Sequence, residues 1–337
     1  MDFHPQNRSL TDLFVDQMLF KFVEVVRRRS AKKGGLRNMI IPIDDGIGLR
    51  ILATGTFEAT TMDGIDLLFG EGLIRSDGIA LDIGANIGVY SIFFGRRCKQ
   101  VVSFEANPVT HKILEVNVAM AHLANVTCLW CGASDSKGTA RLQVPKNGQL
   151  GWATFDVKDV PGGTDSVDVP IDTVDSVMQR IGLADQRVNV IKIDVERHEP
   201  AVLRGVTQVL KKWHPAVLLE TSAGAAAESC YRLLHSLGYQ KFLRFRRLRG
   251  AYELLSPARV VAEPIDMLAG EGDWGHLICA LHEGAAAVLE SELHPARPIA
   301  LPVDQPINGV LAPLSDAGRE AGLEPGLASP QQNGRRP

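Results

Sequence analysis

The segment 79–90 reads IALDIGANIGVY, and the fold follows from it. Its first five residues are mostly apolar, as in a buried parallel strand. Gly84 and Gly88 then break the run, and a helical pattern begins after them. Strand, glycine turn and helix in this order bring a backbone close to an adenosine-bearing cofactor. Gly84 can adopt backbone angles that are closed to other residues, and neither glycine has a side chain to hold a ligand away.

The glycine turn departs from the dinucleotide fingerprint G-x-G-x-x-G. It reads D-x-G-A-N-x-G, with Asp82 at the end of the strand, one glycine fewer and Asn86 in the turn. This spacing favours a nucleoside without a pyrophosphate, such as S-adenosylmethionine. Glu105 ends the next predicted strand, roughly 20 residues further on, where an acidic side chain can accept hydrogen bonds from both ribose hydroxyls. The alternative is that Glu105 caps the helix predicted for 108–121.

A third polar group follows another apolar strand, at the same predicted edge of the sheet. Residues 192–199 read KIDVERHE. Asp194, Glu196 and His198 supply two carboxylates and an imidazole, which can act as a general base on an alcohol or bind a hard cation. The alternative is helix capping, with Glu196 and Glu199 at the N-terminus of the next helix.

Strands and helices alternate along the middle of the chain. This predicts an α/β fold with a doubly wound, mostly parallel sheet and right-handed crossovers. The predicted strands cover residues 79–83, 100–104, 126–131, 188–193, 216–219, 239–245 and 276–281. The predicted helices cover residues 62–71, 88–96, 108–121, 199–210 and 225–237.

A long insert, residues 136–187, interrupts the alternation. Strand-like pieces near 139–144, 152–157 and 167–171 precede a helix at 172–182. Because loops at the carboxyl ends of the strands lie over the site in a doubly wound fold, we expect the insert to contact the substrate, with Trp152 among the contacts. The alternative is a β-rich decoration without a ligand role.

Two regions flank the main domain, which we expect to span residues 55–283. Residues 1–54 form an N-terminal extension, with a helix at 10–29 that ends in basic residues. This helix either packs on the main domain or touches anionic lipid or a partner. Two short strands are expected at Met39–Ile43 and Gly48–Leu52. The proline-rich composition of 284–337 is typical of a disordered tail.

The composition is that of an ordinary soluble protein, with 45% hydrophobic and 22% charged residues. A net charge of −3 gives no reason to expect nucleic-acid binding. No apolar run approaches the roughly 18 residues that span a bilayer, and the N-terminus does not read as a signal peptide. Five cysteines in apolar surroundings indicate reduced thiols, so we expect a cytoplasmic protein. The C-x-x-C pair Cys128 and Cys131 lacks a second pair for zinc, and we assign no metal ligands.

Taken in order, the motifs resemble the FkbM family of methyltransferases. They read LDIGANIGVYS at 81–91, FEANP at 104–108, GASD at 132–135, IDTVD at 171–175, KIDVERHE at 192–199 and VLRG at 202–205. The resemblance covers about residues 55–245, and the ordered set is more specific than any single motif. It implies a seven-stranded, Rossmann-like class I fold and S-adenosylmethionine as methyl donor. It also implies, as the usual reaction, O-methylation of a hydroxyl on a sugar, glycan, glycolipid or natural product.

The resemblance further implies roles for single residues. The glycine turn would line the amino-acid portion of the cofactor, the end of the second strand its ribose, and the end of the third its adenine. These residues are, in that order, Asp82, Gly84, Ala85, Asn86 and Gly88; Glu105 and Asn107; Ser134 and Asp135. Asp194 and Glu196 would face the methyl group and the acceptor. Glu196, His198 or Asp194 would take the acceptor's proton, with or without a divalent cation.

One departure from the family pattern concerns Arg197, where the family usually has glycine. The turn there should be one that a non-glycine residue tolerates, or Arg197 contacts an anionic acceptor. Three alternatives to O-methylation stay open: N- or C-methylation, a nicotinamide-dependent oxidoreductase, and a non-catalytic module. Such a module would hold a partner through the N-terminal helix or the basic stretch 244–249. The sequence carries no readable mark of the acceptor or of the oligomeric state.

Overall fold

The computed structural model describes most of the chain between residues 39 and 283. The described residues are Met18, Lys21, 39–42, 46–146, 150–156, 163–220, 224–246, 251–255, Val260 and 274–283. Met18 and Lys21 are helical. The rest of the helix predicted for 10–29, the tail predicted for 284–337 and most of the basic stretch 244–249 lie outside this set. Within it, no helix combines the length and the apolar character needed to cross a membrane.

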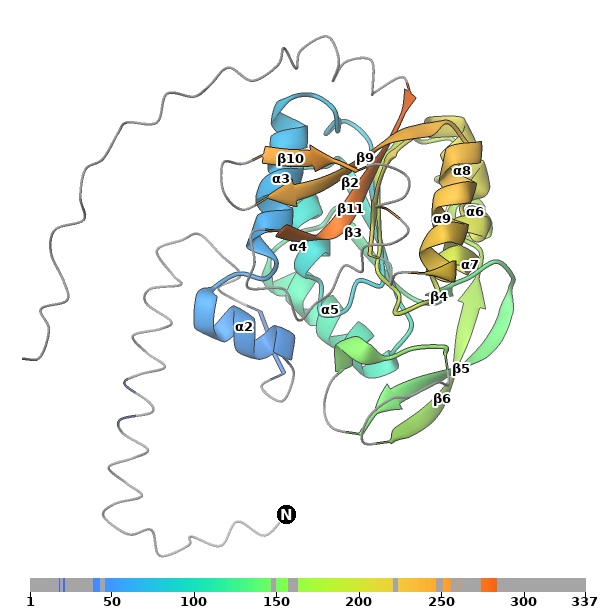
Figure 1. Cartoon of the computed structure of the whole chain (residues 1–337). Helices are drawn as coiled ribbons and strands as arrows, with labels where there is room; N and C mark the ends of the chain where they lie inside the picture. Colours follow the sequence, from blue (N-terminus) through green and yellow to red (C-terminus); the bar gives the residue numbers. More distant parts are fainter. Residues whose placement is uncertain are drawn as a thin grey trace, which may run out of the picture. The chain divides into compact units, whose positions relative to one another are not determined.

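The core is a sheet of eight strands in the order β10-β9-β11-β8-β7-β1-β2-β3 (Figure 1). The run from β3 to β8 is parallel, and β11 pairs antiparallel with both β8 and β9. This confirms the predicted doubly wound, mostly parallel sheet, to which β10 adds an antiparallel edge strand that was not predicted. The strands are β1 Ile79–Ile83, β2 Gln100–Glu105, β3 Val126–Trp130, β7 Val188–Ile193, β8 Ala216–Leu219, β9 Tyr239–Arg246, β10 Ala251–Leu254 and β11 Trp274–His282.

Helices cover both faces of the sheet, so that β1 is buried along its whole length (Figure 1). Ile79, Leu81 and Ile83 pack in one core with α6 to α9, whereas Ala80 packs in the opposite core with α3 and α4. Burial on both faces explains why the strand is an apolar run without alternation. The helices are α3 Ala59–Gly70, α4 Val89–Gly95, α5 Pro108–Met120, α6 Val174–Arg180, α7 Glu199–Gly205, α8 Thr207–Trp213 and α9 Ala225–Ser236.

The single helix predicted for 199–210 is wrong, because it is two helices, α7 and α8. The break follows Gly205, where a Cβ would lie 1.9 Å from the carbonyl oxygen of Ser134. Only glycine allows the helix to approach that backbone so closely.

The strand predicted at Gly48–Leu52 is also wrong: residues Gly46–Thr54 form helix α2. Ile47 and Ile51 are four residues apart and pack with Ile87 and Val89, as the helical period requires. Residues 39–42, part of the other predicted strand, have no regular secondary structure, and Ile43 lies outside the described residues. The sequence does show apolar residues in this segment, but their spacing was assigned to a strand although it is that of a helix.

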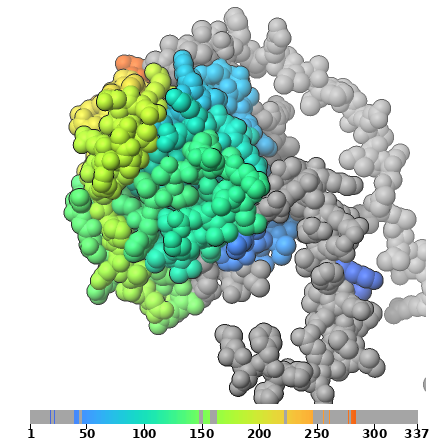
Figure 2. Space-filling model, turned by 180° about the vertical axis from the view of Figure 1, so that it is seen from behind, coloured from blue at the N-terminus to red at the C-terminus, as the bar shows by residue number. Residues whose placement is uncertain are grey.

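Asn117 of α5 fixes this N-terminal segment to the start of α4. Its amide nitrogen donates to the carbonyl oxygens of Ile40, at 3.0 Å, and Ile87, at 2.8 Å, while its oxygen accepts from the Ile40 N–H at 2.5 Å. Seen from behind, the part of the chain that holds α5 and β3 forms the middle of the surface, with the bluer residues of the N-terminal part beside it (Figure 2). The described residues 39–42 and 46–54 of the extension are therefore docked on the main domain.

The insert forms a small sheet in the order β4-β6-β5. Its strands are β4 Gly132–Ala133, β5 Gly138–Pro145 and β6 Thr164–Asp172, and η1 Leu150–Trp152 is a short 3₁₀ helix. The strand predicted at 152–157 is reduced to one bridge between Thr154 and Gln143, and residues 157–162 lie outside the described residues. The predicted helix 172–182 is present as the shorter α6.

Candidate active site

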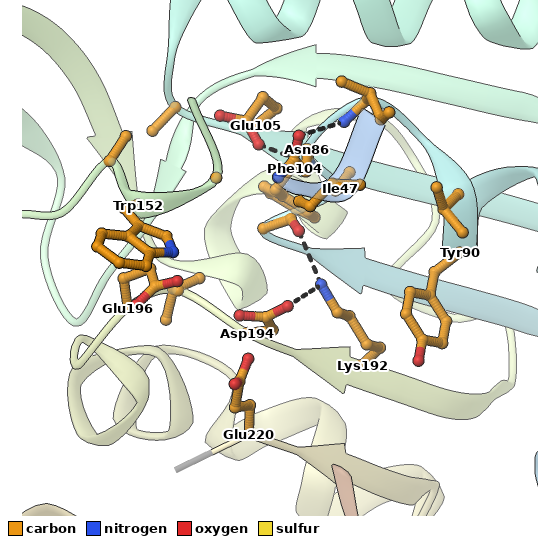
Figure 3. Close-up of a pocket in the computed structure, with 18 of the residues that line it drawn as sticks. Ile47, Asn86, Tyr90, Phe104, Glu105, Trp152, Lys192, Asp194, Glu196 and Glu220 are labelled. Carbon is orange, nitrogen blue, oxygen red and sulfur yellow. Dashed lines mark hydrogen bonds and ion pairs between the residues drawn. The ribbon is translucent and has the colours of Figure 1, made fainter. Parts of the chain in front are cut away.

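A cavity of about 310 Å³ opens at the carboxyl ends of the central strands (Figure 3). Three parts of the chain form its walls. The sheet edge contributes Gly84, Ala85, Asn86, Phe104, Glu105, Ala106, Lys192, Asp194, Val195, Glu196 and Glu220. The segment 46–58 contributes Gly46, Ile47, Arg50, Phe57 and Glu58, and the insert contributes Leu142, Gly151, Trp152, Ala153 and Phe155.

Close contacts set the shape of the glycine turn. Gly84 has a φ of 76°, and a Cβ there would lie 1.8 Å from the carbonyl oxygen of Asp194. Asn86 is also in the left-handed region, with a φ of 50°, and its side chain accepts from the Ile87 N–H at 2.7 Å. Gly84, Ala85 and Asn86 line the cavity, whereas Gly88 begins α4 and faces Leu114.

Asp82 lies beneath the turn and is fully buried, so it does not line the cavity. Its carboxylate accepts from the Ser91 hydroxyl at 2.6 Å, and the Lys192 ammonium is 3.7 Å from its other oxygen. Burial raises the pKa of Asp82, while Lys192 and Ser91 oppose this shift. Asp82 supports the turn from below.

Lys192 is a buried cation at the centre of the site. Its ammonium donates to the Gly84 carbonyl oxygen at 2.7 Å and lies 3.1 Å from the Asp194 carboxylate. Burial lowers the pKa of Lys192, but the charges of Asp194 and Asp82 outweigh burial and raise it above its ordinary value. The protonated lysine therefore links the glycine turn to Asp194 (Figure 3).

Glu105 lines the cavity at the end of β2. Its two oxygens accept from the backbone N–H groups of Asn86 and Asn107, each at 2.8 Å. Burial raises the pKa of Glu105 to about 7, against these two hydrogen bonds. The cap of α5 is Asn107, which accepts from the Val109 N–H at 3.0 Å and does not line the cavity. The capping role considered for Glu105 thus belongs to its neighbour.

Ser134, Asp135 and His198 lie outside the residues that line the cavity. The Ser134 hydroxyl is 3.0 Å from His198 Nε2, and the imidazole packs on the Phe155 ring at 5.0 Å. Burial lowers the pKa of His198. Asp135 pairs with Arg204 at 2.8 Å on the surface. Where the third strand ends, the chain contributes Cys131, Gly132 and Ala133 to the cavity instead.

Glu196 lies below Trp152 in the view of Figure 3, on the same side of the cavity. Burial raises its pKa to about 8, with the Asp194 and Glu199 charges adding to the shift. Glu199 itself caps the turn, since it accepts from the Arg197 N–H at 3.0 Å. Glu199 lies in the first turn of α7, as the alternative proposed, but its carboxyl holds the preceding turn and does not cap the helix, while Glu196 lines the cavity.

Arg197 has a φ of 77°, and Glu196 before it has a φ of 50°. Two successive non-glycine residues thus adopt the left-handed region, which glycine enters at lower cost. Two contacts with the insert accompany the turn. The Thr154 hydroxyl donates to the Glu196 carbonyl oxygen at 2.7 Å, and Arg197 lies 3.8 Å from the Asp156 carboxylate.

The sequence did not assign a role to Glu58, Tyr90, Lys192 or Glu220, all of which line the cavity. Glu220 points toward Asp194 in Figure 3, and burial, followed by the Asp194 charge, raises its pKa well above the ordinary value. A signal was available for two of them. Glu220 follows a buried strand, as Glu105 does, and Lys192 is a charge inside an apolar strand.

Within the described ranges, no three His, Cys, Asp or Glu side chains are arranged to hold a metal ion. The divalent cation considered from the sequence gains no site from the geometry. All five cysteines are free. Burial raises the pKa of the Cys128 thiol to about 12 and that of Cys131 to about 11, so both are protonated at neutral pH.

Comparisons with known proteins agree on one family. A family model described as the methyltransferase FkbM domain matches residues 82–241. Methyltransferase sdnD of Sordaria araneosa is 31% identical over 181 residues, which is 42% of this chain and 69% of that protein. Hexuronic acid methyltransferase AglP of Haloferax volcanii is 28% identical over 218 residues, 60% of this chain and 82% of that protein.

Two solved structures show weaker likeness. Methyltransferase FkbM from Methylobacillus flagellatus KT is 15% identical with a TM-score of 0.37, and the match covers 62% of this chain and 45% of that one. An O-methyltransferase from Bacillus cereus, solved in complex with SAH, is 14% identical with a TM-score of 0.38, over 81% of this chain and 97% of that one.

Proposed function

The chain belongs to the FkbM family of methyltransferases, and on that premise we propose that it transfers a methyl group from S-adenosylmethionine to a hydroxyl of a sugar, glycan, glycolipid or natural product. The observation that carries this proposal is the single cavity that holds both the glycine turn and Glu105. Family membership argues against the nicotinamide-dependent oxidoreductase. N- or C-methylation stays an alternative, which the identity of the methylated atom in the product would decide.

The charges and hydrogen-bond acceptors of the cavity suit the cofactor. Among the described residues that line it, five are Asp or Glu and two are Arg or Lys. S-adenosylmethionine carries a sulfonium and an α-ammonium group, and buried cations need acidic partners. Each oxygen of Glu105 accepts one backbone N–H, which leaves acceptor capacity on both for the ribose hydroxyls.

When bound, S-adenosylmethionine supplies an electrophilic methyl group attached to a good leaving group. The protein then has to align the acceptor oxygen and take its proton. We assign the role of proton acceptor to Glu196, because it lines the cavity and burial raises its pKa to about 8, which makes the ionised carboxylate a stronger base than an ordinary one. Asp194 is held by Lys192, at 3.1 Å, and His198 does not line the cavity.

Two measurements test the proposal. In calorimetry, Glu105→Ala should bind S-adenosylmethionine about 10- to 100-fold more weakly than wild type, whereas Glu115→Ala, at a partly exposed position of α5 outside the cavity, should not. Unchanged affinity in Glu105→Ala would remove the ribose role. In an acceptor screen with radiolabelled S-adenosylmethionine, Glu196→Gln should lose turnover with little loss of cofactor affinity. Full turnover in that variant would clear Glu196 of the base role.

The charge of the cavity also bears on the acceptor. The name of AglP indicates that one relative methylates a hexuronic acid. In the present chain, Glu58, Asp194, Glu196 and Glu220 line the cavity. Burial raises the pKa of Glu58 to about 7 and that of Glu196 to about 8, so above pH 8 both join Asp194 in repelling an anionic acceptor. We therefore expect a neutral methyl glucoside to be methylated faster than the matching glucuronoside. A faster reaction with the glucuronoside would contradict this expectation. It would instead indicate that this chain, like AglP, methylates hexuronic acids.

A further inference from the structure

Segment 46–58 forms a wall of the cavity but lies before the region that the family model matches, which begins at Asp82. It enters the site as helix α2 and a short turn that leads into α3. Ile47 and Ile51 pack it onto Ile87 and Val89, beside the glycine turn. This wall therefore stands next to the part of the cavity that the glycine turn lines.

Glu58 is the acidic residue of this wall, and its backbone is strained. Its φ and ψ are 47° and 46°, in the left-handed region, and its side chain makes no capping hydrogen bond to the α3 helix that follows. Non-glycine residues in this region cost about 1–3 kcal/mol and cluster at ligand clamps. At Glu58 this backbone conformation accompanies a carboxyl group that lines the cavity and does not cap α3.

Tyr90 holds the Glu58 carboxyl in place. The Tyr90 hydroxyl, in the first turn of α4, donates a hydrogen bond to Glu58 Oε2, and both residues line the cavity. Burial raises the pKa of Tyr90 well above its ordinary value, so the hydroxyl remains a donor. Tyr90 lies two residues after Gly88. The Glu58 carboxyl is therefore fixed on the side of the cavity where α4 begins.

The other carboxylates of the cavity have partners or stand elsewhere. Asp194 lies 3.1 Å from Lys192, and Glu220 points toward Asp194 (Figure 3). Glu105 accepts two backbone N–H groups, and Glu196 lies beside Trp152. Glu58 alone among these five combines a position beside the start of α4 with a side chain held by a neutral donor.

We infer that Glu58 binds the α-ammonium group of the cofactor's amino-acid tail, with Tyr90 as the residue that positions it. The inference rests on the proposed function, because it takes S-adenosylmethionine as the ligand. An ammonium group that leaves bulk water needs hydrogen-bond acceptors, and a carboxylate fixed by a tyrosine is a charge-matched one. The N-terminal segment then supplies part of the cofactor site, in addition to covering it.

Calorimetry with three ligands tests the inference without an acceptor. S-adenosylmethionine and S-adenosylhomocysteine carry the amino-acid tail, whereas 5′-methylthioadenosine lacks it. S-adenosylhomocysteine and methylthioadenosine both contain a neutral sulfur, so their difference isolates the tail. Glu58→Gln should weaken both tailed ligands about 10- to 100-fold and leave methylthioadenosine unchanged. Tyr90→Phe should weaken the same two ligands by a smaller factor. Glu71→Gln, an exposed change at the other end of α3, is the matched control.

The outcomes separate the inference from its premise. If wild type binds none of the three ligands, the proposed function itself fails. If wild type binds them and Glu58→Gln keeps full affinity for the tailed ligands, the ammonium role is wrong. An equal loss for all three ligands would also overturn the inference, because it would make Glu58 a structural residue of the cavity. Methylthioadenosine binding reports on the folded adenosine site in every variant.

Discussion

The Lys192 ammonium group contacts three acceptors, and all three depend on its positive charge. Its ammonium donates to the Gly84 carbonyl oxygen and lies 3.1 Å from Asp194 and 3.7 Å from Asp82. Removing one member of a buried ion pair leaves the other charge without compensation, which costs about 3–5 kcal/mol. The residue therefore supports the fold and, through Gly84 and Asp194, the floor of the active site.

We predict that Lys192→Met destabilises the protein by about 3–5 kcal/mol, because it leaves the buried Asp82 and the partly buried Asp194 without their cation. Urea unfolding at pH 7 would measure this. Lys112→Met is the control, since Lys112 pairs with Glu115 at 2.7 Å on the surface, where such pairs contribute about 0–1 kcal/mol. Equal free energies of unfolding for the two variants would show that the ion pairs of Lys192 contribute no more to stability than the surface pair of Lys112.

Glu58 gives a pH-dependent prediction. Burial raises its pKa to about 7, a shift that the Tyr90 hydrogen bond opposes; the nearby charges are Asp194, Lys192 and Arg50. A carboxyl group whose pKa is higher in the folded than in the unfolded protein keeps its proton up to a higher pH when folded. The free energy of unfolding therefore falls as the pH rises from about 4.5 to 7. Glu58→Gln lacks this penalty. It should therefore be more stable than wild type by about 1–2 kcal/mol at pH 8, and the gain should shrink at pH 5.5.

Urea titrations of the cofactor-free wild type and Glu58→Gln at both pH values would measure that difference. The other cavity carboxyls, such as Glu105 and Glu196, titrate in both proteins and cancel in the comparison. A gain that is equal at the two pH values would mean that Glu58 does not titrate between them. The upward direction of the pKa shift matters for function. An ionised Glu58 destabilises the free protein, and a bound cation would remove that cost.

At the scale of elements, the junction of α7 and α8 depends on Gly205. A Cβ at this position would lie 1.9 Å from the Ser134 carbonyl oxygen, which is backbone and cannot move aside. Gly205→Ala must therefore push the end of α7 away from the backbone of Ser134, which directly follows β4. A clash of this kind in a packed region typically costs about 1–3 kcal/mol or more.

We predict that Gly205→Ala lowers the midpoint of thermal unfolding by several degrees, because no flexible side chain can move to relieve the clash with the backbone. Gly70→Ala, at the end of α3, makes the same chemical change where nothing lies within 4 Å of the new Cβ, and it should be neutral or stabilising. Calorimetric scans of both variants would test this. A Gly205→Ala protein as stable as Gly70→Ala would show that α7 can shift freely.

The elements that sequence predicted well are those whose signals are local. The strand 79–83, its glycine turn and the acidic strand ends at Glu105 and Asp194 follow from runs, breaks and charges that neighbours in the chain already show. Helix α2 was misread, because its apolar residues fit both periods until Ile87 and Val89 supply the surface that they pack on.

Single site residues were harder to place, for two physical reasons. Glu58 has no sequence signal, since its role depends on how the segment 46–58 docks and on the distant Tyr90. Ser134 and Asp135 were expected near the adenine, but only Cys131, Gly132 and Ala133 reach the cavity before the chain turns away. A motif fixes the order of residues, whereas the direction of each side chain depends on tertiary packing.

At the scale of the whole molecule, the cavity needs three parts of the chain to stay together: the sheet edge, the segment 46–58 and the insert. Asn117 hydrogen-bonds Ile87, beside the glycine turn, and Ile40, whose neighbours Met39 and Ile41 pack with Ile51 of the segment 46–58. Thr154 joins the insert to the Glu196 turn at 2.7 Å. Cofactor affinity should therefore depend on a residue such as Asn117, which does not line the cavity.

The last prediction tests that dependence with a matched pair of asparagines. Asn117→Ala removes the hydrogen bonds to both backbones and should speed amide exchange in residues 39–58 and weaken S-adenosylmethionine binding, because Glu58 loses its fixed position. Asn125→Ala removes two comparable hydrogen bonds, to the Gly95 carbonyl at 2.9 Å and the Cys98 carbonyl at 3.1 Å, far from that segment in the chain. Each change should cost about 1–3 kcal/mol. If hydrogen exchange in residues 39–58 responds equally to both, the loss is global, and Asn117 has no special part in holding the N-terminal wall against the cofactor site.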